Sequence, residues 1–138
     1  MTRSFRTALL AAAIAVLSPL PIQAADETPT AVVVLYRIAP GKHLDFLRWQ
    51  AARDAIDKEV GIAPTMFYAH RQGDSWDYVS IGPVTTPEQD AKADAAAAKQ
   101  GLATGFKASL EFRTFVAMHS DTMAEGPETA SQLVEKAK

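Results

Sequence analysis

The chain has 138 residues, of which 48% are hydrophobic and 22% charged, a composition typical of one ordinary globular domain. Its formal net charge is −2, so it offers no basic surface for nucleic acid. The absence of cysteine excludes disulfides, thiolate nucleophiles, iron–sulfur clusters and cysteine zinc sites. Any chemistry must therefore come from imidazole, carboxylate, hydroxyl or phenol groups, or from a bound cofactor.

The first 24 residues have the pattern of a secretory signal peptide. Arg3 and Arg6 make its start positively charged, residues 8–17 form an apolar run of ten, and prolines end that run. A membrane-spanning helix needs about 20 apolar residues, so the run is too short for a permanent anchor. The sequence therefore predicts a periplasmic or secreted protein with its signal peptide at residues 1–24 removed.

Hydrophobic patterning predicts the element order β-α-β-β-α-β for the mature chain. A short run rich in valine predicts the first strand, helical spacing of apolar residues predicts the first helix, and two β-type runs around Gly73 predict a hairpin. Thr86 and Pro87 are typical of a helix start, since threonine caps and proline suits the first helical position. The predicted elements are a strand at 31–38, a helix at 42–60, strands at 65–71 and 76–81, a helix at 87–100 and a strand at 111–118.

This order is the split βαβ, or ferredoxin-like, pattern of an α+β domain: a four-stranded antiparallel sheet with both helices on one face. We expect a flexible leader at 25–30, the domain at 31–123 and a helical tail at 124–138, whose apolar stripe predicts a short docked helix. The uncovered sheet face needs a partner, most simply a second copy of the chain. On that face we expect Val32, Val34, Met66, Val116 and Met118.

Two segments give the chain a resemblance to a known superfamily. They are VVVLYRIAPGKHLDFLRWQ at 32–50 and EFRTFVAMHSD at 111–121, on either side of the hairpin. Through this succession of strand, Pro-Gly turn and helix, residues 31–123 resemble the dimeric α/β-barrel superfamily, in particular its NIPSNAP-like and EthD-like members and related monooxygenases. The resemblance implies a homodimer whose sheets face each other around a cavity. It also implies a family that includes cofactor-free oxygenases, haem proteins, isomerases and proteins with no known activity.

Side chains alternate along a strand, so each predicted strand has an aliphatic face and a face with polar tips. If the aliphatic faces meet the helices, the others form a pocket wall on the open side of the sheet. A two-residue hairpin loop would pair His70 with Asp77 and place the polar-tipped residues of the two hairpin strands on opposite faces of the sheet. A loop of odd length would keep them on one face. The same aromatics could instead only fill a dimer interface. The candidate ligand-binding residues are Tyr36, Tyr68, Trp76 and Tyr78, with Ser80 and Thr114 on the same face.

Imidazole is the side chain best suited to proton transfer near neutral pH. His70, near Tyr68 and Trp76, is a candidate general base or haem ligand, with a purely structural role as the alternative. His119 and Asp121 stand two residues apart on extended chain, so they share one side and form a candidate oriented base at the mouth of the pocket. Because no third ligand is expected nearby, the sequence predicts no metal site. It predicts no cofactor either, although it does not exclude haem.

The chain contains no GxSxG, HExxH, P-loop, dinucleotide-binding or EF-hand motif. We therefore expect an exported, homodimeric, small-molecule-binding domain whose activity, if it has one, is that of a cofactor-independent oxygenase or isomerase acting on a small aromatic or quinone-like compound. The alternative is a non-enzymatic interaction or stress-associated module whose sheet face is only a dimer interface.

The first testable prediction concerns export. The protein recovered from outside the cytoplasm is expected to start near Ala25, because small residues at Ala24 and Ala25 suit a signal peptidase. Intact-mass spectrometry of the periplasmic or secreted fraction measures this. A membrane-bound protein that still starts at Met1 would contradict the prediction.

Overall fold

A computed structural model of the chain describes residues 30–73 and 75–138. The predicted signal peptide and all of the predicted leader except Thr30 lie outside the described residues. The elements are β1 (Thr30–Ile38), α1 (His43–Glu59), β2 (Met66–Ala69), β3 (Tyr78–Pro83), α2 (Pro87–Lys99), α3 (Gly105–Phe115), β4 (Val116–Glu125) and α4 (Ala130–Lys136).

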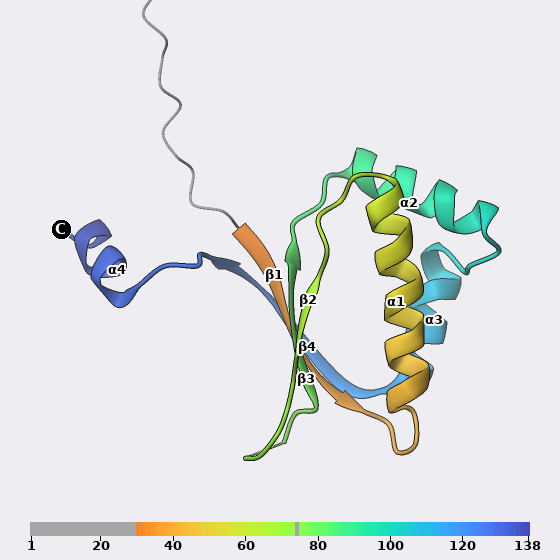
Figure 1. Ribbon diagram of the computed structural model, residues 1–138, viewed down its shortest axis with the longest axis horizontal. Coiled ribbons are helices and arrows are strands. Elements are labelled where there is room, and N and C mark those ends of the chain that lie inside the picture. The colour runs from red at the N-terminus through yellow and green to blue at the C-terminus, as the bar shows by residue number, and fades with distance from the viewer. Residues whose placement is uncertain (1–29, 74) are drawn as a thin grey trace, which may run out of the picture.

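The four strands form one antiparallel sheet in the order β2-β3-β1-β4, with β1 and β3 at its centre. Helices α1, α2 and α3 all lie on one side of this sheet (Figure 1). The order of elements and strands confirms the predicted α+β, ferredoxin-like fold. The start of α2 is also confirmed, because Thr86 and Gln89 form the reciprocal hydrogen bonds of a capping box.

An aromatic cluster joins the sheet to α1. Phe46 of α1 is fully buried, and its ring centroid lies 5.0 Å from that of Tyr36 on β1 and 6.2 Å from that of Phe67 on β2. A second cluster joins the two longest helices, where Ile56 of α1 packs against the small side chains of α2. The aromatic cluster therefore sets the distance between α1 and β1.

The strand predicted at 111–118 is wrong in its first half, because residues 105–115 form α3 and β4 begins at Val116. Phe112 and Phe115 are three residues apart, so they share one face of a helix but point to opposite faces of a strand. In α3 both rings pack against Trp49 of α1, at centroid distances of 5.7 and 6.2 Å. Burial of both rings together favours the helix over the strand.

The assignment of valines to the uncovered face also needs correction. Val34 packs against the aromatic cluster on the helix side, and Val116 does the same. Val32 shares the side of Val34, since residues i and i+2 of a strand point the same way. The side opposite the helices, called the open face below, instead carries the apolar residues Val33, Leu35, Met66, Tyr68, Val79, Ile81 and Met118, together with Arg37, Ser120 and Thr122.

The predicted C-terminal helix is present as α4, but it is not docked on the part of its own chain that the structure describes. None of its residues is buried, and Leu133 and Val134 are 53% and 59% exposed. The ammonium of Lys136 lies 2.7 Å from a carboxylate oxygen of Glu128. Within residues 30–73 and 75–138, none of the helices has the length and apolar character needed to cross a membrane.

The second testable prediction concerns the carboxylates where α1 meets α2. Burial raises the pKa of Asp57, and the nearby charges of Asp54 and Asp90 raise it further while Arg53 lowers it. A raised carboxyl pKa means that the fold disfavours the charged form, so stability is lost as the pH rises through the folded pKa. Asp57→Asn should therefore raise the free energy of unfolding at pH 7 and leave it unchanged near pH 3, where the carboxyl is protonated in both states.

Thermal unfolding at the two pH values measures this difference. The matched control is Asp94→Asn, which removes an exposed carboxylate from α2 and should change the melting temperature little at either pH. A gain from Asp57→Asn that is the same at both pH values would contradict the electrostatic explanation.

Candidate functional site

A pocket of about 250 Å³ lies between the helix side of the sheet and α1. Its floor comes from the central strands β1 and β3, and Gln50 reaches it from α1, one helical turn after the buried Phe46. It is called the Tyr36 pocket below. The lining residues are Val32, Val34, Tyr36, Gln50, Thr65, Ser80, Gly82 and Pro83.

Two buried hydroxyl groups meet in the floor of the Tyr36 pocket. The phenol oxygen of Tyr36 and Oγ of Ser80 are 3.1 Å apart and hydrogen-bonded. Tyr36 is 6% exposed and Ser80 only 1%. A buried hydroxyl without a partner costs about 1–3 kcal/mol, so each group satisfies the other and holds its orientation.

The surroundings of Tyr36 keep its phenol protonated. Burial raises the pKa of Tyr36, and the negative charge of Asp121 also raises it, while hydrogen bonding to Ser80 and Gln50 lowers it. The net pKa lies above the ordinary value of a tyrosine. Tyr36 is therefore a neutral hydrogen-bond donor at physiological pH, suited to a carbonyl or phenolate oxygen of a ligand.

His119 and Asp121 lie beside this floor, on the edge strand β4. His119 pairs with Tyr36 across the sheet and Asp121 pairs with Val34, so all four residues share the helix side. Nε2 of His119 is 3.4 Å from a carboxylate oxygen of Asp121, as the spacing in the sequence led us to expect. The two side chains are 40% and 60% exposed, and neither is among the residues that line the Tyr36 pocket, so this pair, called the rim pair below, lies beside the pocket rather than inside it.

The rim pair has the parts of an oriented general base. The rings of His119 and of Phe112 on α3 form a T-shaped pair at a centroid distance of 5.0 Å, and the Asp121 carboxylate lies 3.4 Å from Nε2 of the imidazole. When Nε2 donates to that carboxylate, Nδ1 is left as the proton acceptor. The site therefore combines a neutral donor in the floor with an acceptor at the rim.

Tyr78 lies on the helix side as well, next to the aromatic cluster. Its ring stacks on Phe46 at 5.8 Å, and its phenol oxygen is 3.4 Å from Nδ1 of His43. Burial raises the pKa of Tyr78, and the charge of Asp77 raises it further. Tyr78 therefore supports the core beneath the start of α1, and it is not among the residues that line the Tyr36 pocket.

The expectation of one aromatic face on the open side is wrong, and the hairpin register gives the reason. Ala69 pairs with Tyr78, and the amide of His70 donates to the carbonyl of Asp77 at 2.9 Å. This is the pairing that a two-residue loop was expected to give, and it divides the candidate ligand-binding residues between the two faces of the sheet. Tyr36, Tyr78 and Ser80 face the helices, while Tyr68 lies on the open face and is 59% exposed.

His70 and Trp76 stay together at the hairpin end, away from the other candidates. Their ring centroids are 4.9 Å apart, and neither residue lines the Tyr36 pocket or the groove on the open face. Across the described part of the chain, no three His, Asp or Glu side chains gather as a metal site.

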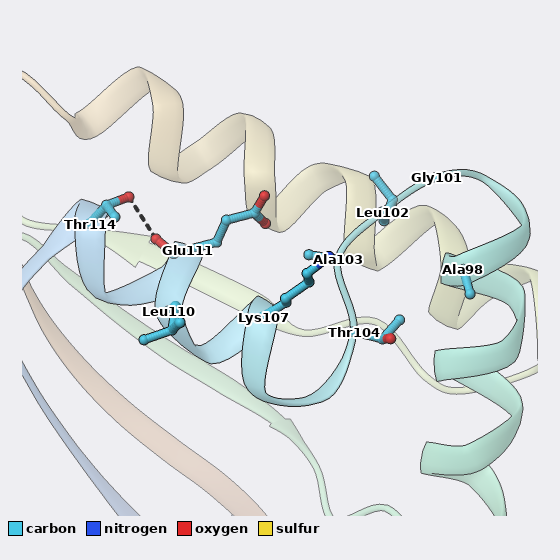
Figure 2. A pocket seen from close by; sticks show the side chains of 9 residues that line it. All are labelled: Ala98, Gly101, Leu102, Ala103, Thr104, Lys107, Leu110, Glu111 and Thr114. Atoms are coloured by element: carbon cyan, nitrogen blue, oxygen red, sulfur yellow. Dashed lines mark hydrogen bonds between the residues drawn. The ribbon is translucent and has the colours of Figure 1, made fainter.

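A larger depression of about 660 Å³ lies between the end of α2 and α3, and Figure 2 shows the residues around it. Thr114, expected on the open face of a strand, lies here on α3 and donates to the carbonyl of Glu111 at 2.7 Å. The Glu111 carboxylate in turn accepts a hydrogen bond from the Trp49 indole at 3.0 Å. The depression thus offers no free acid–base pair, and the Tyr36 pocket is the better candidate site.

Gln50 is the functional residue that sequence reasoning missed. The sequence spacing indicated its position, because Gln50 follows the fully buried Phe46 by four residues and therefore lies on the same face of α1. A polar side chain on the face that a helix turns toward a sheet needs a polar partner. The hydroxyl of Tyr36 on β1 provides that partner.

No protein-family model matches the chain, and no curated protein matches its sequence. Among solved structures, it is similar to At3g17210 from Arabidopsis thaliana, at 8% identity over 74% of this chain and 99% of that chain, with a TM-score of 0.50. It is also similar to a mutant of SnoaB, a cofactor-independent oxygenase from Streptomyces nogalater, at 15% identity over 75% and 98% of the two chains, with a TM-score of 0.50. At these identities the likeness shows the fold alone.

The third testable prediction concerns the hydrogen bond in the floor. Tyr36→Phe and Ser80→Ala should each lower the free energy of unfolding by about 1–2 kcal/mol, because the first leaves the buried Ser80 hydroxyl unpaired and the second removes a hydrogen-bond partner from the buried Tyr36 hydroxyl. The double variant should cost about 1 kcal/mol less than the two single losses added together. Urea unfolding of the four proteins measures the cycle, and strict additivity would contradict the hydrogen bond.

Proposed function

We propose that this chain is an exported, homodimeric, small-molecule-binding domain whose site is the Tyr36 pocket. The observation that carries the proposal is the buried pair of Tyr36 and Ser80 beneath Gln50, with the pair of His119 and Asp121 on the adjacent strand. Hydroxyl and amide tips around an otherwise aliphatic pocket are typical of ligand sites. Export is supported by the signal pattern at residues 1–24.

The size of the pocket favours a ligand of one ring. Its volume of about 250 Å³ falls just below the range of about 300–1,000 Å³ that is usual for drug-sized ligands. The Tyr36 phenol supplies a donor for one oxygen atom of such a ligand, and Val32 and Val34 supply apolar surface for its ring. A small aromatic or quinone-like compound has both features.

The chemistry that this arrangement supports is proton transfer. His119, oriented by Asp121, accepts a proton from an enol, phenol or activated C–H group, and the Tyr36 phenol stabilises the negative charge that develops on the substrate oxygen. A proton returned at another carbon makes the enzyme an isomerase. Reaction of the resulting carbanion with O₂ as co-substrate makes it a cofactor-independent oxygenase, the activity given for SnoaB.

The homodimer is supported by the apolar character of the open face. Its largest side chains are well exposed, with Met66 at 60%, Tyr68 at 59%, Met118 at 45% and Ile81 at 38%. A contiguous apolar sheet face is an association surface. A second copy placed there would complete the dimeric α/β barrel implied by the resemblance to NIPSNAP-like and EthD-like proteins. The same face favours the competing function, a non-enzymatic interaction module.

The fourth testable prediction separates these two functions. A screen of single-ring phenols and quinones by thermal shift should yield compounds that stabilise the wild-type protein, and Tyr36→Phe should weaken their binding at least tenfold because the donor is lost. His119→Gln should leave binding within about threefold, as expected of a rim residue, but should abolish turnover.

Tyr68→Phe is the matched control, since it makes the same chemical change on the open face and should not alter binding. Compounds that stabilise all of these proteins equally, or the absence of any stabilising compound, would favour the interaction module over the small-molecule site.

A further inference from the structure

The C-terminal arm, residues 126–138, leaves the sheet at the far end of β4. Glu125, the last residue of β4, pairs with Thr30 at the start of β1, so the arm begins where the sheet ends. In Figure 1, α4 lies on the side of the sheet away from α1, α2 and α3. The arm therefore projects past the open face (Figure 1), and within the described residues none of the side chains of α4 is buried.

The helix in this arm is well formed although it is short. It has seven residues, and isolated helices of fewer than about 12 residues are marginal in water. Thr129 and Gln132 form a capping box at its start. The ammonium of Lys136 lies 2.7 Å from Glu128 and 3.8 Å from Glu125, which ties the helix back to the base of the arm.

The apolar stripe of α4 is left without a partner in the described chain. Leu133 and Val134 are 53% and 59% exposed, and both lie on the stripe that the 3.6-residue period defines with Ala130 and Ala137. Helices this short gain most of their stability from packing of such a stripe. We therefore expect the exposed stripe of α4 to pack against a partner from outside the domain.

The open face and the base of the arm form one continuous apolar surface. A groove of about 310 Å³ lies where they meet, lined among others by Val33, Met66, Tyr68 and Ile81 of the sheet and by Gly126 and Pro127 of the arm. A partner docked on the open face at this groove therefore contacts the base of the arm that carries α4.

We propose that the C-terminal arm is a clasp between two copies of the chain, in which the Leu133 and Val134 stripe packs against the partner docked on the open face. The inference rests on the proposed homodimer. A two-fold interface is self-complementary, so each chain clasps the other and every dimer contains two such contacts. Without Arg3 and Arg6 the mature chain has 12 basic and 16 acidic residues, a net charge of −4 that is largely screened between copies at physiological salt.

Dilution of the full mature chain, followed by sedimentation velocity, tests the clasp. Leu133→Ala combined with Val134→Ala should weaken dimerisation at least tenfold, because the change removes apolar contacts twice per dimer while alanine preserves the helix. The matched control is Ser131→Ala with Glu135→Ala, which truncates two residues outside the stripe and should leave the dissociation constant within twofold.

A second measurement identifies what the helix touches. With a photoreactive benzophenone side chain in place of Val134, irradiation should give a cross-linked product of twice the chain mass. A dimer that survives the stripe variant unchanged, with cross-links formed only within one chain, would overturn the clasp and leave the proposed function standing. A wild-type chain that is monomeric at micromolar concentration would overturn both the clasp and the proposed dimer.

Discussion

The structure depends on the burial of one amphipathic side chain at the centre of the sheet. Tyr36 must bury its ring against Phe46 while giving its hydroxyl a hydrogen-bond partner, and Ser80 on the adjacent strand provides that partner. Because β1 lies between β3 and β4, fixing the side of Tyr36 also fixes the side of His119. The polar groups of the candidate site are therefore a consequence of how the core is closed.

Strand alternation then gives the two sides of the sheet different properties. The helix side combines the aromatic cluster with hydroxyl, amide and imidazole groups, whereas the open face is apolar over β1, β2 and β3 and carries the hydroxyls of Ser120 and Thr122 on the edge strand β4. A ligand site and an association surface consequently lie back to back on the same strands. A change of one residue in β1 acts on one side only, which makes the two roles separable by substitution.

The order of elements was predictable from the sequence because turns and caps are local signals. Gly82 with Pro83 and Thr86 with Pro87 mark their boundaries through backbone geometry alone. The faces of the strands were not predictable, because they depend on the hairpin register and on which residues fill the space beneath α1. Large aromatic side chains fill that space better than the valines do, which is why the aliphatic set faces outward. Helix α3 was missed because its phenylalanines also suit a strand.

The central claim is that the helix side of the sheet holds the ligand, and neighbouring valines of β1 test it most directly. Val34 lines the Tyr36 pocket and Val33 lines the groove on the open face, so their methyl groups report on opposite sides. In a methyl-labelled sample titrated with a stabilising phenol or quinone, the NMR signals of Val34 should shift while those of Val33 stay in place. Movement of the Val33 signals with Val34 unchanged would contradict the account.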